Sequence, residues 1–154
     1  MRGLAEIIAA EAGVVSAFVL LLKQEQEALK LGEVDVLSEI IEHKSAAVSE
    51  LAPLSTARNA ALANAGLASD RAGIDAWLQK QPNDKAVRQN WGNLQVLAAE
   101  AKELNRVNGE LIGLRIRHNA DLLESLLSQA NRQDLYSADG QTAPSTHPRI
   151  IDSA

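Results

Sequence analysis

Residues 4–32 read LAEIIAAEAGVVSAFVLLLKQEQEALKLG, and their spacing decides the fold class. Pairs of apolar residues recur every seven residues, at 7/8, 14/15, 21/22 and 28/29, with charged side chains between the later pairs. This spacing predicts one long amphipathic helix, which ends where Gly32 permits the left-handed backbone conformation.

The whole chain has the composition of packed helices. Hydrophobic residues make up 46% of the 154 residues, but aromatic residues only 3%. Ala and Leu fit helices at little entropic cost, whereas strands favour aromatic and β-branched side chains. We therefore expect an all-α protein with one core, because this length fits one domain.

Two further helices are expected in the middle of the chain. Asp35 is a suitable N-cap for a second long helix that ends near Gly66. Proline removes a backbone hydrogen bond and clashes with the preceding turn, so we expect a kink or a short break at Pro53. A short helix follows the capping residues Ser69 and Asp70 and ends before Pro82.

The longest helix is expected after the N-cap Asn83, over residues 84–130. At 1.5 Å per residue it spans roughly 70 Å, so we expect an elongated antiparallel bundle of three long helices and one short helix. Residues 131–154 are rich in Ser, Thr, Pro, Asp and Gly. Such a segment buries little apolar area, which predicts a disordered, flexible tail after a bundle domain of residues 1–130.

Charge and composition argue against several classes of partner. The net charge is -5, with basic and acidic residues interspersed, so nucleic acid is not an expected partner. The chain has no cysteine, which agrees with a reducing compartment. The longest apolar run, residues 17–22, is too short to span a bilayer, and no signal peptide is apparent. We expect a cytoplasmic protein that is not embedded in a membrane.

Catalytic and metal-binding motifs are not found. None of the histidines His43, His118 and His147 has Glu three residues before it, so the sequence predicts no metal site and no cofactor. Glycine-rich nucleotide loops and nucleophile motifs are missing too, which argues against an enzyme or a small-molecule substrate. A histidine phosphotransfer signalling domain centred on His43 remains an alternative, although a solvent-facing histidine is the favoured interpretation.

The stretch LNRVNGELIGLRIRHN, residues 104–119, interrupts the apolar seam of the last helix with Asn105, Asn108, Arg115 and Asn119. Polar residues on a helix seam cost stability but fix register and partner choice. Gly109 and Gly113 each cost about 1 kcal/mol in a helix interior. The glycines indicate either close packing between helices of this chain or the approach of a partner.

The block LNRVNGELI, residues 104–112, resembles the signature of the FlgN family, in which Asn followed by Asn-Gly and paired aliphatic residues marks the C-terminal helix. Further similarities cover nearly the whole chain. They are Asn119, Leu122 and Leu126, Glu25 within LLKQEQEAL, Lys44 and Arg58, Trp77 and Trp91, and the segment YSADG at residues 136–140.

This resemblance implies a type III export chaperone in the cytoplasm. Its clients would be the hook-filament junction proteins FlgK and FlgL, bound by their C-terminal helical segments, kept from premature assembly and delivered to the export apparatus. The amphipathic pattern is consistent with such a task, because an incompletely covered apolar groove accepts a client helix. Another helical adaptor or secretion chaperone remains an alternative.

Candidate binding residues follow from the seam and from the resemblance. The client-binding residues are expected to be Asn108, Leu111, Ile112, Arg115, Asn119, Leu122, Leu123 and Leu126. Tyr136, with Asp139 and Gly140, is the candidate anchor for the cytoplasmic domain of the export gate protein FlhA.

Overall fold

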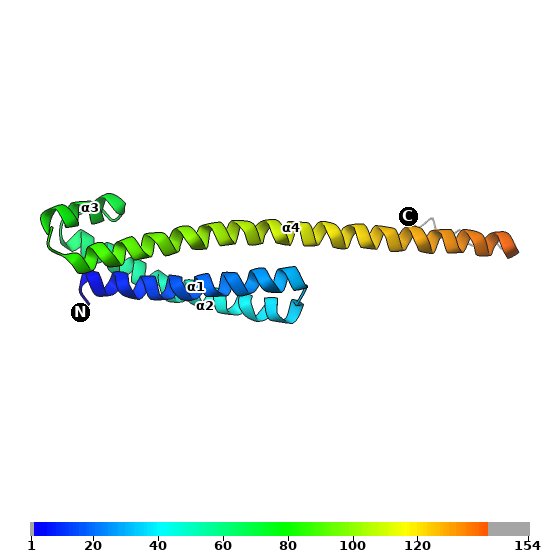
Figure 1. The fold of residues 1–154 in the computed structure, drawn as a ribbon, viewed down its shortest axis with the longest axis horizontal. Coiled ribbons are helices and arrows are strands. Elements are labelled where there is room, and N and C mark those ends of the chain that lie inside the picture. Colours follow the sequence, from blue (N-terminus) through cyan, green and yellow to red (C-terminus); the bar gives the residue numbers. More distant parts are fainter. Residues whose placement is uncertain (1, 142–154) are drawn as a thin grey trace. The chain divides into compact units, whose positions relative to one another are not determined.

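The computed structural model describes the backbone of residues 2–141 and the side chains of residues 2–132. The described backbone forms four helices, α1 (Leu4–Leu31), α2 (Val34–Asn64), α3 (Arg71–Lys80) and α4 (Lys85–Gln141), joined by turns (Figure 1). The predicted all-α fold of three long helices and one short helix is confirmed. The chain divides into two units, residues 1–112 and residues 113–154, and α4 belongs in part to each.

The core of the first unit is built around α1. Eleven of its 28 residues are buried, whereas α2 buries three of its 31. By length and composition alone α1 is also apolar enough to cross a membrane, a test that the core helix of a soluble protein passes as well. In this structure nine of its apolar side chains are buried, whereas Leu20 and Leu31 are exposed. The main cluster consists of Leu4, Ile8, Ala12, Val15 and Val19 of α1 with Leu62, Ile74, Val87 and Leu94.

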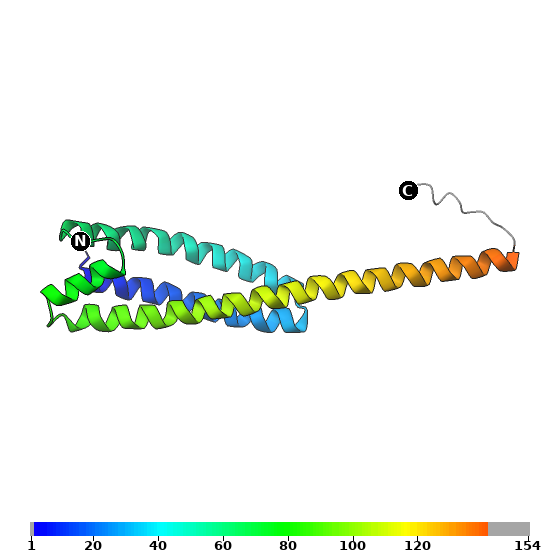
Figure 2. The ribbon, with the colours of Figure 1, turned by 90° about the horizontal axis from the view of Figure 1, so that it is seen from above.

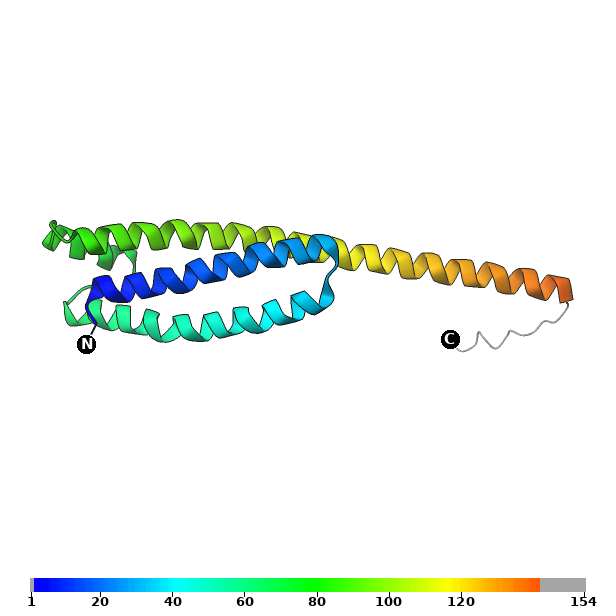
Figure 3. The same cartoon turned by 60° about the horizontal axis from the view of Figure 1, so that its bottom comes forward.

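Within the first unit, α1 runs alongside both α2 and the first part of α4 (Figure 2, Figure 3). The chain reverses between α1 and α2, so these two helices run antiparallel (Figure 3). The first part of α4 runs parallel to α1. Near one end Asn90 Nδ2 donates to the carbonyl of Ala5 at 3.0 Å, and further along Asn108 Nδ2 donates to the carbonyl of Leu22 at 2.8 Å.

The turn between α1 and α2 follows one expectation and departs from another. Gly32 adopts the left-handed conformation with φ of 72°, and its N–H donates to the carbonyl of Ala28, so the predicted end of α1 is confirmed. The N-cap position of α2 is occupied by Glu33 rather than by the predicted Asp35. Asp35 lies in the first turn of α2, where a negative charge still interacts favourably with the helix dipole.

α2 continues through Pro53 as one helix of 31 residues, so the break expected there is absent. Proline leaves the carbonyl four residues earlier, that of Ser49, without its helical partner. Both Pro53 and Ser49 are on the exposed side of α2. Water can satisfy a carbonyl on that side, which explains why the helix is not interrupted.

α3 is a short helix with a side-chain cap. Asp70 Oδ1 accepts a hydrogen bond from the Gly73 N–H at 3.1 Å, which confirms the predicted N-cap. After α3, Asp84 accepts from Trp77 Nε1 at 3.1 Å and from the Val87 N–H at 3.2 Å. Asp84, rather than the predicted Asn83, therefore satisfies the first turn of α4 and ties it to α3.

The last helix ends later than the sequence pattern indicates. It was expected to stop near residue 130, and α4 continues to Gln141. The first residues of the predicted tail therefore extend a helix. The prediction of flexibility over residues 142–154 falls outside the described residues.

Gly73→Ala is expected to destabilise the first unit by about 1–3 kcal/mol, the usual cost of overpacking. Gly73 is buried in α3, and a Cβ there would overlap the backbone carbonyl of Ala68, which has little room to move. Gly92→Ala is the matched control, because nothing lies within 4 Å of its Cβ position. Thermal unfolding followed by circular dichroism should rank Gly73→Ala well below Gly92→Ala, and equal midpoints would contradict this account.

Candidate functional site

A first polar network crosses the core of the first unit at Glu11. Its side chain is only 2% exposed, and its carboxylate accepts from Arg58 Nη1 at 2.7 and 3.0 Å and from Ser55 Oγ at 3.1 Å. The Arg58 guanidinium also lies over the Trp91 ring, 5.3 Å from its centroid, at a distance typical of a cation–π contact. This network joins α1, α2 and α4.

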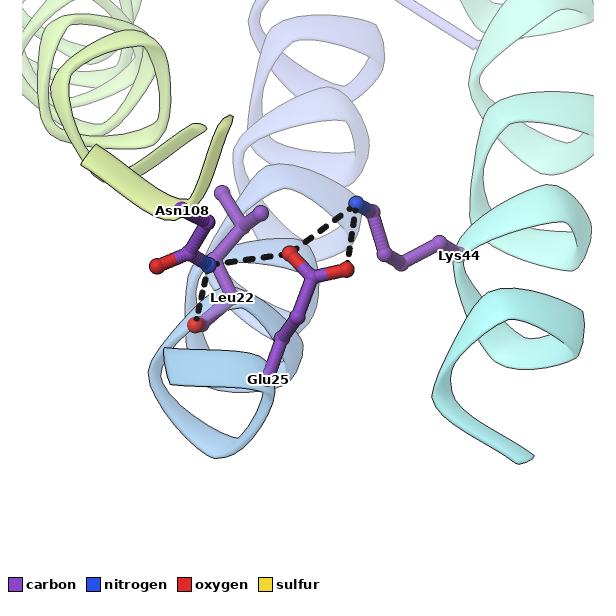
Figure 4. A network of polar contacts seen from close by, with 4 residues as sticks. All are labelled: Leu22, Glu25, Lys44 and Asn108. Carbon is purple, nitrogen blue, oxygen red and sulfur yellow. Dashed lines mark hydrogen bonds and ion pairs between the residues drawn. The ribbon is translucent and has the colours of Figure 1, made fainter. Parts of the chain in front are cut away.

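A second network of the same kind is centred on Glu25, whose side chain is 6% exposed. Lys44 Nζ of α2 donates to both oxygens of its carboxylate, at 3.1 and 3.2 Å. Asn108 Nδ2 of α4 donates to Glu25 Oε1 at 2.9 Å as well as to the Leu22 carbonyl (Figure 4). Again a buried carboxylate of α1 holds a cation of α2 and a side chain of α4.

The two carboxylates lie fourteen residues apart on α1, which is two heptads. Each carboxylate keeps its partners in only one alignment of α2 and α4 along α1. A helix shifted along its axis would leave a buried charge without its partner. Polar residues on helix seams select register in this way. The networks therefore act structurally, by fixing which turns of the three helices lie opposite each other.

Burial along α4 stops at Asn108, which is 1% exposed. From Gly109 to Arg132 no described side chain of α4 is buried. In the second unit, six large apolar side chains of this stretch are between 50% and 62% exposed, and one of them, Leu114, lies on the polar side of the helix. The other five are Ile116, Leu122, Leu123, Leu126 and Leu127.

These five residues and Ala120 lie on one side of the helix, and we call them the Leu face. At about 100° per residue they occupy an arc of roughly 160°. The opposite side carries Arg117, Asp121, Glu124, Ser125 and Ser128, together with Leu114. The second unit thus contains an amphipathic helix whose apolar side is not covered by any described part of the chain. Exposed apolar surface of this extent is typical of interaction sites.

The predicted client-binding residues differ in how far they are buried. Asn108 is buried, and its amide nitrogen donates to the Leu22 carbonyl and to Glu25 in the second network. Leu111 and Arg115 are partly buried. The exposed members are Ile112, Asn119, Leu122, Leu123 and Leu126. Ile116 and Leu127 were not predicted from the sequence, although their spacing of seven and four residues from Leu123 places them on the same face.

Gly109 does not serve close packing within this structure. It is exposed, and nothing lies within 4 Å of the position that a Cβ would take. At Gly113 the nearest atom is the side-chain Nη1 of Arg117, at 3.7 Å, in its own helix. Neither glycine is required by a neighbouring helix of the described chain, so the interpretation as internal helix packing is wrong for both.

On the exposed side of α4, Arg106 joins two acidic residues. It donates to Glu103 at 2.7 and 3.0 Å and to Glu110 at 2.6 Å. The hydrogen bonds from Arg106 hold the pKa of Glu103 below its usual value, and Glu103 in turn raises the pKa of Arg106. Such exposed pairs contribute little to stability, so this cluster contrasts with the two buried networks.

The remaining candidate residues are the histidines and the predicted anchor for the export gate. His43 and His118 are exposed, and no group of three or more His, Cys, Asp or Glu side chains placed to hold a metal occurs among the described residues. Tyr136, Asp139 and Gly140 lie within the last turns of α4, but their side chains fall outside the described residues. Their role in docking to the export gate therefore stays a prediction.

Comparison with known proteins identifies the family over almost the full length of the chain. Residues 1–144 match the family described as FlgN protein. The chain is 33% identical over 123 residues to the flagella synthesis protein FlgN of Proteus mirabilis, covering 79% of this chain and 77% of that protein. It is 28% identical over 152 residues to the flagella synthesis protein FlgN of Escherichia coli (strain K12), covering 96% and 94%. No solved structure matches. The chain therefore belongs to the FlgN family of flagella synthesis proteins.

Proposed function

We propose that this chain is a cytoplasmic type III export chaperone for the hook-filament junction proteins FlgK and FlgL. It binds their C-terminal helical segments, prevents premature assembly and delivers them to the flagellar export apparatus. The observation that carries the proposal is the Leu face, an apolar helix surface left open in a protein of the FlgN family.

The open face keeps apolar side chains in contact with water, which costs free energy. Fully burying a Leu or Ile side chain is worth about 1.5–3 kcal/mol, and five such side chains are at least half exposed here. An amphipathic client helix recovers that free energy by laying its own apolar side on the face. The same contact hides the client's assembly surface, which is the action expected of a chaperone.

The predicted client-binding residues take different parts in this proposal. Leu122, Leu123 and Leu126 provide apolar contact, and Ile116 and Leu127 join them. Asn119 lies within the same arc and offers a hydrogen bond. Asn108 contributes indirectly, because it fixes α4 against α1. Leu111, Ile112 and Arg115 complete the proposed set.

Titration calorimetry of the full chain with purified C-terminal segments of FlgK and FlgL tests the proposal. We expect saturable one-to-one binding to both segments and none to a peptide of the same composition in scrambled order. A negative heat-capacity change should accompany binding, because apolar surface is buried. Failure of both segments to bind would overturn the proposal.

The proposal assigns Tyr136 to delivery rather than to client binding. Tyr136→Ala is expected to leave client affinity within about twofold and to weaken docking to the cytoplasmic domain of FlhA by roughly tenfold or more, since aromatic anchors carry a large share of such interfaces. Tyr136→Phe is the matched control, because it keeps the ring. Both affinities should be measured side by side by surface plasmon resonance. Equal losses in both, with a lower melting temperature, would make Tyr136 a structural residue.

A further inference from the structure

Asn119 lies between two apolar residues in a row along α4. Ile112 and Leu126, seven residues before and after it, are 41% and 62% exposed. Residues seven apart lie on nearly the same side of a helix, because seven residues make almost two turns. An apolar side chain at position 119 would continue the row, so the amide of Asn119 interrupts an otherwise apolar strip of surface.

The neighbours of Asn119 on the helix surface are mostly apolar as well. Of the four residues three or four positions away, three are Ile116, Leu122 and Leu123, which are 62%, 50% and 58% exposed, and the fourth is Arg115. Asn119 is itself exposed, and its side chain makes no hydrogen bond to a described residue. A client helix on the Leu face would therefore remove the Asn119 amide from water together with the leucines beside it.

An amide that is removed from water needs hydrogen-bond partners, and Asn108 of the same helix shows how it obtains them. Asn108 Nδ2 donates to the Leu22 carbonyl at 2.8 Å and to Glu25 Oε1 at 2.9 Å, both on α1. Polar side chains within a helix seam lower stability but fix the register of the partner. Asn108 finds its partners within its own chain, whereas an Asn119 amide covered by the client can find them only on the client.

From these surroundings we infer that Asn119 determines specificity for the client, by pairing with a polar side chain on the apolar side of the client helix. The inference rests on the proposed function and adds to it the chemistry of the client. The client helix carries one hydrogen-bonding side chain, an amide, hydroxyl or carboxylate, with apolar residues three or four positions away on each side. This pair sets the register of the client on α4. A wholly apolar helix is disfavoured, because it would bury the Asn119 amide without a partner.

Asn119→Leu in the full chain distinguishes a paired amide from one that the interface only tolerates. If the amide is only tolerated, the leucine adds apolar contact and strengthens binding of the FlgK C-terminal segment. If the amide is paired, the leucine leaves the client's polar side chain buried without a partner. We expect this second result, with binding weakened by roughly tenfold or more in titration calorimetry. Asn119 is exposed in the free protein, so the fold should tolerate the change. Ser125→Leu, on the polar side, is the control and should bind as the wild type does.

Leucine substitutions in the client identify the partner of Asn119. Each polar residue of the FlgK segment is replaced in turn, and each variant segment is titrated into the wild-type chain and into Asn119→Leu. We expect one substitution to weaken binding to the wild-type chain and to restore binding to Asn119→Leu, because two apolar side chains then meet.

The inference is overturned if Asn119→Leu binds the FlgK segment as tightly as the wild type or more tightly. It is also overturned if Ser125→Leu loses as much affinity, or if no substitution in the client restores binding to Asn119→Leu. In each of these cases the wild-type chain still binds the segment, so the proposed function stands. Wild-type chain that binds neither FlgK nor FlgL would overturn the proposed function itself, and the inference with it.

Discussion

Arg58→Ala is expected to lower the free energy of unfolding by about 3–5 kcal/mol, the usual cost of removing one partner of a buried ion pair. The substitution leaves the Glu11 carboxylate, which is 2% exposed, with the Ser55 hydroxyl as its one hydrogen-bond donor among the described side chains. It also removes the guanidinium that lies over Trp91. Urea unfolding followed by circular dichroism measures the change, and small single domains often show a single transition.

Two further variants separate the loss of a buried pair from a general effect of removing arginine. Arg106→Ala breaks exposed ion pairs to Glu103 and Glu110 and should change stability by no more than about 0.5 kcal/mol. The double substitution Glu11→Leu with Arg58→Leu should be more stable than Arg58→Ala, because no unpaired charge remains. A similar small loss for Arg58→Ala and Arg106→Ala would show that the Glu11 network is not the constraint described here.

Replacing Leu123 and Leu126 together with Asp is expected to weaken client binding by roughly a hundredfold or more, because two carboxylates would be buried in an apolar interface. The fold should survive. Both side chains are about 60% exposed, at 58% and 62%, so the free protein loses little packing. Titration calorimetry with the FlgK segment measures the affinity, and circular dichroism checks the helices.

The matched control for that pair is Ser125→Asp with Ser128→Asp, which adds the same charge to the polar side of the same turns. Its client affinity should equal that of the wild type. Unchanged affinity in a folded Leu123→Asp, Leu126→Asp variant would move the client site away from the Leu face. Unfolding of that variant would mean that the two leucines are core residues.

The fold was predicted correctly where one residue type determines how a helix begins or ends. Gly32 ends α1 and Asp70 caps α3 as expected, because each residue type suits one backbone position. Of the kink or short break expected at Pro53, the break is absent, since the effect of a helical proline depends on whether the freed carbonyl faces water, and that is a tertiary property. The end of α4 at Gln141 was missed because residues 131–141 have a mixed composition that carries no apolar period.

The site was predictable only in part. Their spacing of four residues identified Leu122 and Leu126 as one side of a helix, but spacing alone does not distinguish an open face from a covered one. Asn108 shows most clearly what residue spacing does not predict. Its place on the seam was read correctly, and the structure shows that its partners are Leu22 and Glu25 of its own chain. The pairing of Glu11 with Arg58 joins residues 47 positions apart and has no local signal.

Hydrogen exchange of the full chain, measured with and without the FlgK C-terminal segment, tests the central claim most directly. The claim is that the open apolar side of α4 in the second unit binds the client. The account predicts that the client slows exchange most strongly over residues 113–132, whose side chains are all exposed or partly exposed in the free protein. Slowed exchange confined to α1 and α2, with residues 113–132 unchanged, would contradict it.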